Sequence, residues 1–353
     1  MTTEPDTSML RARRVDLGAS EDEAEAMFER GWTDGLPVVP PTPERVARML
    51  GGTTRAPDEI VAVVPPNLVE CTVEKVAVNA VLAGCRPEYL PVVLAAVEAA
   101  CTDTFNMHGL LATTWFSGPV VVVNGPITRA IGMNSGVNAL GQGNRANATI
   151  GRALQLVVRN VGGGRPGEVD RATLGQPGKY TFCFAEDEVG SPWEPLHVSR
   201  GVDPAQSAVT LFPGESPRGL ADQLGRTADE LASSFAACLR TVWGPKAVIA
   251  FDALVVVSPE HARVFRESGW SRDRLVDELM ARLQIPGEEL VRGAGGIAEG
   301  VDPSLREAMI PKFRAGGLLI VHAGGGAGFF SAIVGGWAAG AMGSDPVTRV
   351  IGT

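Results

Sequence analysis

The segment LLIVHAGGGAGFFSAIVGGW, residues 318–337, constrains the fold more than any other part of the chain. It lies within an uncharged run between Arg314 and Asp345. Its length would allow a transmembrane helix, but each glycine inside a helix costs about 1 kcal/mol relative to alanine, and three are consecutive here. His322 would also lie inside such a span. We therefore predict a buried strand ending at His322, a glycine turn at 324–328 and a short buried helix, with no membrane partner.

The order strand, tight turn, helix recurs along the chain. The apolar strand PVVVVNGPI precedes a glycine- and asparagine-rich loop, and the strand AVIAFDALVVV precedes SPEHARVF, where Ser258 should cap a helix beginning at Pro259. This recurrence predicts an α/β fold with two α/β lobes built from strand–glycine-rich turn–helix units. One glycine-rich loop in each half makes pseudo-symmetry between the lobes a hypothesis.

The predicted organisation is a flexible tail at 1–20, a first α/β domain at 21–215 and a second at 216–353. The turn-rich segment FPGESPRG marks the boundary between the domains. Within the first domain, Asn147 is the expected cap of a helix that runs to about Asn160. The segment KYTFCFAEDE, residues 179–188, is the expected strand with alternating polarity.

Charge and cysteine content exclude several classes of protein. With 31 Lys and Arg against 40 Asp and Glu, the net charge is −9, so nucleic acid is not an expected partner. The basic patch at 11–14 has no apolar core behind it and is not a secretion signal. Five scattered cysteines without a CxxC pair indicate a reducing compartment, so we expect a cytoplasmic protein.

No cofactor is expected. The Gly324-Gly325-Gly326 segment lacks the third glycine of a dinucleotide fingerprint at the required spacing, and the chain ends before a second strand with a terminal acid could follow. The segment GQGNRA also fails this test, and no GxxxxGK[ST] motif is present. Nicotinamide and ATP binding are therefore not predicted.

Two glycine-rich loops are the candidate substrate-binding segments. Each is expected to precede a helix, whose free amides and partial positive charge could hold a carboxylate or phosphate. The alternative is that the glycines only permit tight turns or close packing. The candidate binding residues are Asn134, Ser135, Asn138, Asn144, Arg145, Asn147, Gly324, Gly325 and Gly326.

Four residues are candidates for catalysis. His261 falls in the first turn of the predicted helix at 259, where a helix N-terminus favours neutral imidazole, and His322 ends a strand directly before a glycine turn. Cys85 lies beside Arg86 at a helix start, which would stabilise a thiolate. Asp34 lies in the rigid TDGLPVVPP turn. A hydrogen-bonded structural role is the alternative for each histidine, an inert buried thiol for Cys85 and turn formation for Asp34.

The segment AEDEVGSPWEPLH gathers four carboxylates and His197 in a loop stiffened by prolines. A metalloenzyme using His197, His322 and the carboxylates of 186–194 is therefore an alternative, although the spacing matches no known metal cage. A solvated acidic loop is the simpler interpretation, and no metal site is predicted.

Several ordered motifs carry a resemblance that covers nearly the whole chain: DGLPVVPPT, GMNSGVN with RANATIGRA, SPWEPLH and SPEHA. On these motifs the chain resembles a bacterial family without an assigned chemistry, which is associated with proteins that carry a (seleno)cysteine-Gly-Ser-Cys motif. This chain has no such motif, so the resemblance implies no thiol redox role and transfers no catalytic residue.

The predicted function is that of a cytoplasmic enzyme acting on a small anionic, carboxylate-like substrate, as a hydrolase or a lyase. The glycine- and asparagine-rich loops would bind the anion, and His261 or His322 would transfer protons with Cys85 or Asp34 assisting. A non-catalytic subunit or small-molecule binding protein is a further alternative. The small-residue segment AIVGGWAAGAMG predicts subunit contacts and hence a homo-oligomer.

Overall fold

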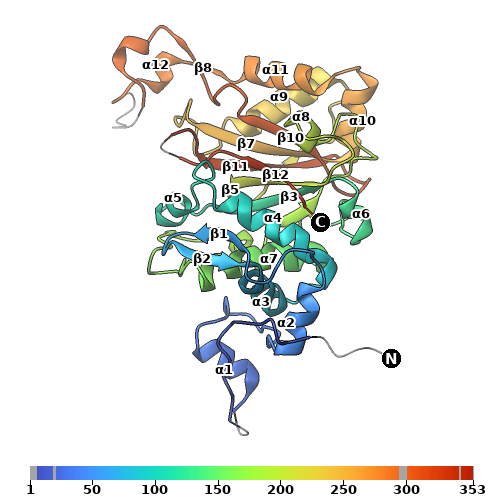
Figure 1. Cartoon of the computed structure of the whole chain (residues 1–353). Coiled ribbons are helices and arrows are strands. Elements are labelled where there is room, and N and C mark those ends of the chain that lie inside the picture. Colours follow the sequence, from blue (N-terminus) through green and yellow to red (C-terminus); the bar gives the residue numbers. More distant parts are fainter. Residues whose placement is uncertain (1–5, 19–20, 294–299, 342, 353) are drawn as a thin grey trace.

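A mixed β-sheet forms the centre of the computed structural model, which describes residues 6–18, 21–293, 300–341 and 343–352 (Figure 1). Within these ranges the sheet has eight strands: six follow the order β10-β7-β11-β5-β3-β4, β12 pairs with β5, and β6 pairs with β11. The strands are β3 (Gly118–Asn124), β4 (Cys183–Ala185), β5 (Ala208–Gly214), β6 (Arg218–Ala221), β7 (Phe251–Val257), β10 (Leu318–His322), β11 (Phe330–Ala338) and β12 (Val347–Val350). The predicted α/β class is confirmed.

The sheet curls until its two ends meet. The strands β4 and β10 stand at opposite ends of the strand order, yet the amide of Asp187, just after β4, donates to the carbonyl of His322 in β10 at 2.8 Å. Side chains from all six ordered strands share one apolar cluster inside the curl. The parallel pairs β3–β4 and β7–β10 therefore end in the same region.

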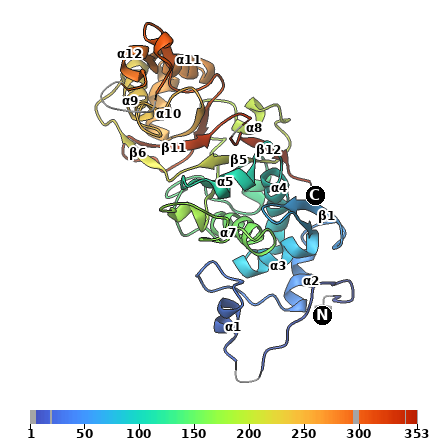
Figure 2. The same cartoon turned by 90° about the vertical axis from the view of Figure 1, so that its left-hand side faces the viewer.

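Helices cover the outer surface of this sheet in two groups, which lie on opposite sides of it in both views (Figures 1 and 2). The first group consists of α3 (Val73–Ala83), α4 (Leu90–Ala100) and α7 (Arg145–Asn160), and it packs on outward side chains of β3 and β5 such as Val121 and Leu211. The second consists of α9 (Ala228–Leu239), α10 (Pro259–Glu267) and α11 (Arg272–Arg282), and it packs on β7 and β10.

Shorter elements complete the described chain. Two small antiparallel pairs lie outside the main sheet, β1 (Ile60–Val64) with β2 (Val69–Thr72) and β8 (Gln284–Pro286) with β9 (Met309–Pro311). The remaining helices are α1 (Glu23–Glu29), α2 (Pro43–Leu50), α5 (Met107–Ala112), α6 (Ile127–Ala130), α8 (Leu196–Ser199) and α12 (Gly287–Leu290), with 3₁₀ turns at Pro87–Tyr89, Pro177–Lys179 and Pro303–Leu305.

Local sequence explains where several helices begin. Thr42 and Thr72 accept backbone hydrogen bonds as N-caps of α2 and α3, and Thr227 forms a capping box with Glu230 at the start of α9. The cap of α7 is Asn144, whose side chain accepts from the amide of Asn147 at 3.0 Å. The prediction that Asn147 is the cap is therefore wrong by three residues. Both asparagines are good capping residues, and the helix begins after the first of them.

The segment after the second glycine turn is a strand, which corrects the prediction of a helix. The strand β11 pairs with β7 and β6, and then crosses to β5 at Gly336. A Cβ at Gly336 would lie 2.9 Å from the carbonyl oxygen of Asp252, and one at Gly335 would lie 2.6 Å from Glu215 Oε1. The paired glycines therefore permit a close approach between strands. This packing requirement, and not helix propensity, determines the structure of the segment.

The strand β4 also differs from its prediction. Only Cys183–Ala185 pairs as a strand, and all three residues are buried. Cys183 contacts the outer cluster under α7, and Phe184 lies inside the curled sheet. The expected polar alternation is absent from these residues because both faces of the strand are covered.

The main sheet includes strands from both predicted domains. The strand β11, from the second predicted domain, pairs with β5 from the first and with β7 from the second. The boundary at 215/216 and the pseudo-symmetry of the two lobes stay predictions. Of the predicted tail, residues 1–5 and 19–20 lie outside the described residues, while the amides of Arg11 and Ala12 donate to the carboxylate of Glu74 at 2.9 and 3.0 Å.

Most of the segment AIVGGWAAGAMG is buried by contacts within the same chain, because Ala332 to Ala338 belong to β11 in the main sheet. Met342 lies outside the described residues. The predicted homo-oligomer therefore stays a prediction without this support. In the part of the chain that the structure describes, no helix combines the length and apolar character needed to cross a bilayer.

The substitution Gly336→Ala should destabilise the protein by about 1–3 kcal/mol, because the added methyl group would press on the backbone of Asp252. Gly219→Ala in β6 is the matched control, since a Cβ there meets nothing within 4 Å. Urea denaturation of both variants measures the difference. Equal free energies of unfolding for the two variants would contradict the close strand crossing.

Candidate active site

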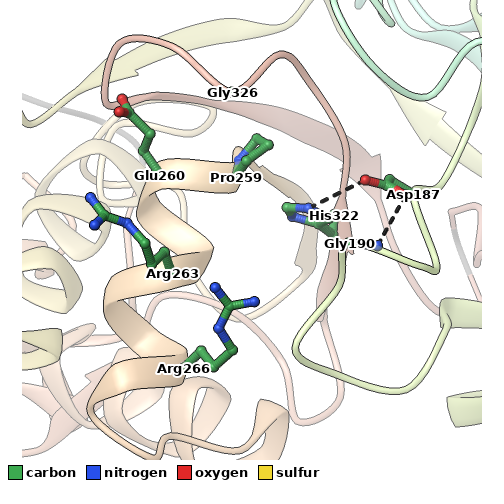
Figure 3. A pocket seen from close by; sticks show the side chains of 8 residues that line it. All are labelled: Asp187, Gly190, Pro259, Glu260, Arg263, Arg266, His322 and Gly326. Atoms are coloured by element: carbon green, nitrogen blue, oxygen red, sulfur yellow. Dashed lines mark hydrogen bonds and ion pairs between the residues drawn. The ribbon is translucent and has the colours of Figure 1, made fainter.

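A cleft of about 500 Å³ opens where β10 ends, between α10 and the loop that follows β4 (Figure 3). Eight residues line it: Asp187, Gly190, Pro259, Glu260, Arg263, Arg266, His322 and Gly326. A volume of this order suits a small molecule. The carboxyl ends of strands in α/β sheets are also the usual place for ligands.

His322 has a fixed tautomer. Its Nδ1 lies 2.9 Å from the carbonyl oxygen of Val257, at the end of the neighbouring strand β7. A carbonyl only accepts, so Nδ1 must carry the proton, and in the neutral ring Nε2 is then an acceptor. That nitrogen lies 3.8 Å from Asp187 Oδ2 at the wall of the cleft. The side chain is 1% exposed, so its orientation is fixed by its surroundings.

Burial lowers the pKa of His322, and the positive charge of Arg266 lowers it further. The carboxylate of Asp187 and the hydrogen bond to Val257 act in the opposite direction, but the pKa remains below its usual value. The imidazole is therefore neutral near pH 7. A neutral imidazole with a free acceptor nitrogen is the form that a general base requires.

Asp187 is placed by the backbone around it. Its amide donates to the carbonyl of His322 at 2.8 Å, and its Oδ1 accepts from the amide of Gly190 at 3.1 Å. The second oxygen, Oδ2, faces His322. In this arrangement one carboxylate oxygen stabilises the loop while the other remains available beside the imidazole.

The opposite wall of the cleft is α10. Its buried side presents Ala262 and Phe265, and Arg263 and Arg266 are three residues apart on its exposed side. In Figure 3 the guanidinium of Arg266 lies between α10 and the loop that carries Asp187, whereas Arg263 points to the other side of the helix. Among the described residues Arg266 forms no ion pair, while Arg263 lies 4.0 Å from Glu267.

Glu186 holds the strand ends together behind the cleft. Its Oε2 accepts from Asn124 Nδ2 and from the amide of Leu196, both at 2.7 Å, and its Oε1 accepts from the amide of His322 at 3.4 Å. The guanidinium of Arg272 lies 3.9 Å from Oε1. Burial raises the pKa of Glu186 to about 7, despite these hydrogen bonds.

His261 does not line the cleft. It is fully buried between Phe235 and Phe329, its Nε2 donates to the carbonyl of Asp222 at 3.2 Å, and its Nδ1 accepts from Ser331 Oγ at 2.7 Å. Both ring nitrogens are therefore engaged. The geometry favours the structural alternative for this histidine.

Cys85 and Asp34 also lie away from the cleft. Burial raises the pKa of the Cys85 thiol to about 12. The hydrogen bond to the carbonyl of Thr149 and the charge of Arg145 lower this pKa, but their effect is smaller. Asp34 forms a two-point ion pair with Arg152 at 2.7 and 2.8 Å. Burial raises the pKa of Asp34, but Arg152 outweighs this effect and keeps it below the usual value. Their geometry supports structural roles.

The two glycine-rich loops meet, but their polar groups bind one another. The amide of Gly324 donates to the carbonyl of Ser135 at 2.9 Å, and a Cβ at Gly325 would lie 2.9 Å from Val137. No helix follows the second loop, so the expected helix N-terminus does not exist there. Only Gly326 of the nine predicted binding residues lines the cleft.

The remaining binding residues are engaged within the first loop or next to it. Asn134, Asn138, Asn144 and Asn147 donate to the backbone carbonyls of Val137, Gln142, Gly132 and Asn134, respectively, and Arg145 donates to that of Gly84. These amides stabilise the loop, so its geometry supports the tight-turn alternative.

The metal alternative receives no support from the arrangement of ligands. In the described ranges no group of three or more His, Cys, Asp and Glu side chains is placed to hold a metal ion. His197 is fully buried, with Nδ1 at 3.9 Å from Glu188 Oε1, and it does not line the cleft with His322.

Sequence reasoning missed the arginines of the cleft and included Asp187 only as a potential metal ligand. A signal for the arginines was present: in SPEHARVFRE the spacing of Ala262 and Phe265 marks the buried side of the helix, so Arg263 and Arg266 fall on the other side. Nothing in the sequence indicates that this side faces the strand ends.

No protein-family model matches the chain, and no curated protein matches it in sequence. The resemblance to a bacterial family stays a prediction, and the case for function rests on the geometry of the cleft.

The pKa of His322 should lie below 6.5, with the proton of the neutral ring on Nδ1. Asp187→Asn should lower this pKa further, because the carboxylate charge raises it, whereas Arg266→Gln should raise it. Titration by nitrogen NMR of ¹⁵N-histidine-labelled protein measures the pKa and identifies the tautomer. A neutral ring protonated on Nε2 would contradict the proposed orientation.

Cys85 should react with iodoacetamide at least about tenfold more slowly than the partly exposed Cys238, since it is buried and remains a thiol. Peptide mass spectrometry of the native protein at mildly alkaline pH gives both rates. Faster labelling of Cys85 would restore it as a candidate nucleophile.

Proposed function

We propose that this protein is an enzyme that acts on a small anionic, carboxylate-like substrate by acid–base chemistry, as a hydrolase or a lyase. One observation carries the proposal. A neutral imidazole whose acceptor nitrogen is fixed by Val257 lies in the same cleft as Arg266, an arginine without an ion-pair partner among the described residues. Base and anion anchor are thus on opposite walls of a space the size of a small molecule.

In this proposal Arg266 binds the substrate carboxylate, because a guanidinium offers two parallel N–H donors that match the two carboxylate oxygens. Arg263 points to the other side of α10 and lies 4.0 Å from Glu267, so Arg266 is the main anchor. The anion then lies across the cleft from His322 Nε2, which removes a proton from the substrate or from water. Asp187, 3.8 Å from Nε2, stabilises the imidazolium that forms.

The same residues complete the cycle. The imidazolium returns its proton to the leaving group or to the product, and the ring becomes neutral again. Its lowered pKa favours this return, since the charged ring is costly in a buried position. The base form should therefore be available throughout the neutral range.

Arg266→Gln should weaken binding of succinate about tenfold or more, which corresponds to the loss of one charge-assisted contact. Isothermal titration calorimetry of succinate with the two proteins measures the change. Arg306→Gln, an exposed arginine outside the cleft, is the control and should bind like the wild type. If the wild type fails to bind succinate and malonate, or if Arg266→Gln binds equally well, the proposed anion site is wrong.

A further inference from the structure

Two hydrogen-bond acceptors face each other in the cleft. With Nδ1 protonated, the neutral His322 offers only a lone pair at Nε2, and Asp187 Oδ2 is also an acceptor, 3.8 Å away. Two acceptors at this distance repel each other unless a donor lies between them. A single oxygen with two hydrogens can reach both atoms through slightly bent bonds of about 2.8 Å.

Glycine at 190 preserves the space that such a donor needs. A Cβ at this position would overlap Asp187 Oδ2 and lie 3.2 Å from His322 Nε2. The φ angle of Gly190 is not in the left-handed region, so the backbone conformation does not require glycine. Glycine at 190 thus leaves the position beside these two acceptors free of a side chain, which is a second observation independent of the distance between them.

We propose that Asp187 and His322 hold and activate a nucleophilic water molecule, and that the enzyme is a hydrolase for acyl esters of small dicarboxylic acids. The inference rests on the proposed function and narrows it from two reaction classes to one. Water donates one hydrogen to each acceptor, so its oxygen lone pairs point toward the substrate. A lyase that removes a proton from carbon would not require a water molecule between the base and Asp187.

The reaction balances without any other reactant. The water oxygen forms a bond to the acyl carbon while its proton moves to His322 Nε2. The bond between the acyl carbon and the alcohol oxygen then breaks, and the imidazolium gives its proton to that oxygen. The products are the free dicarboxylic acid and the alcohol, while Arg266 holds the distal carboxylate throughout.

The substrate class follows from the charges on the two walls. Arg266 favours an anion such as a carboxylate, whereas Asp187 and the neutral ring of His322, together with Glu260 at the cleft wall, disfavour a second anion. The reacting acyl group must therefore be uncharged, as it is in a monoester of a dicarboxylic acid. Para-nitrophenyl hydrogen succinate fits this description, and para-nitrophenyl butyrate is a neutral ester with an acyl chain of the same length.

The decisive experiment compares hydrolysis of the two esters by the wild type, Gly190→Ala and Gly219→Ala. The wild type should hydrolyse the succinate ester with kcat/KM at least about tenfold above that for the butyrate ester. Gly190→Ala should lower kcat for the succinate ester about a hundredfold, because its methyl group displaces the water, while its Kd for succinate stays within about twofold. Gly219→Ala should behave like the wild type.

Asp187→Asn tests the same water without adding bulk. It should lower kcat, leave succinate binding intact and shift the acidic limb of the pH profile of kcat/KM to lower pH, because the pKa of His322 falls. The inference is overturned if the wild type hydrolyses neither ester, or if Gly190→Ala retains kcat within about twofold. If either result is found and the wild type still binds succinate, only the activated water is ruled out and the proposed anion site remains. If the wild type does not bind succinate, both the anion site and the activated water are ruled out.

Discussion

The buried carboxylate of Glu186 is the interaction on which the rest of this structure depends. It follows β4 directly and accepts hydrogen bonds from three other segments, through Asn124, Leu196 and His322, of which Asn124 and His322 are distant from it in sequence. The strands β4 and β10 do not pair with each other along their length, so this carboxylate and the contact from Asp187 to His322 close the curled sheet. Burial raises the pKa of Glu186 to about 7, so its placement carries an energetic cost. Such costs are typical of functional sites.

Closure of the sheet at this point explains the chemistry of the cleft. The base, His322, comes from β10, its acidic neighbour Asp187 comes from the loop after β4, and the arginines come from α10, which follows β7. The three elements that carry these residues, which are β10, the loop after β4 and α10, are not adjacent in sequence. His322 and Asp187 are on one wall, and Arg263 and Arg266 are on the other, which they share with Glu260. The position of Arg266 opposite His322 is the main support for an enzyme that binds an anion and activates a neutral group beside it.

Much of the fold could be predicted from the sequence because it follows from local rules. Apolar runs identified β3, β7 and β10, and Ser258 followed by Pro259 marked the start of α10. The strand β11 could not be predicted in this way, since Gly335 and Gly336 serve a strand crossing that exists only in the folded sheet. The site was predicted only at His322 and Gly326. Asp187 and Arg266 belong to it because the sheet curls, and no short-range pattern encodes the curl.

Amide hydrogen exchange in Glu186→Ala tests most directly whether this carboxylate organises the site. The account predicts that the amides of His322 and Leu196 lose protection, since their acceptor is removed, while the amide of Val122 in the middle of β3 keeps its wild-type protection. Unchanged protection at His322 and Leu196 would show that the strand ends are held together by other contacts, and would contradict the account.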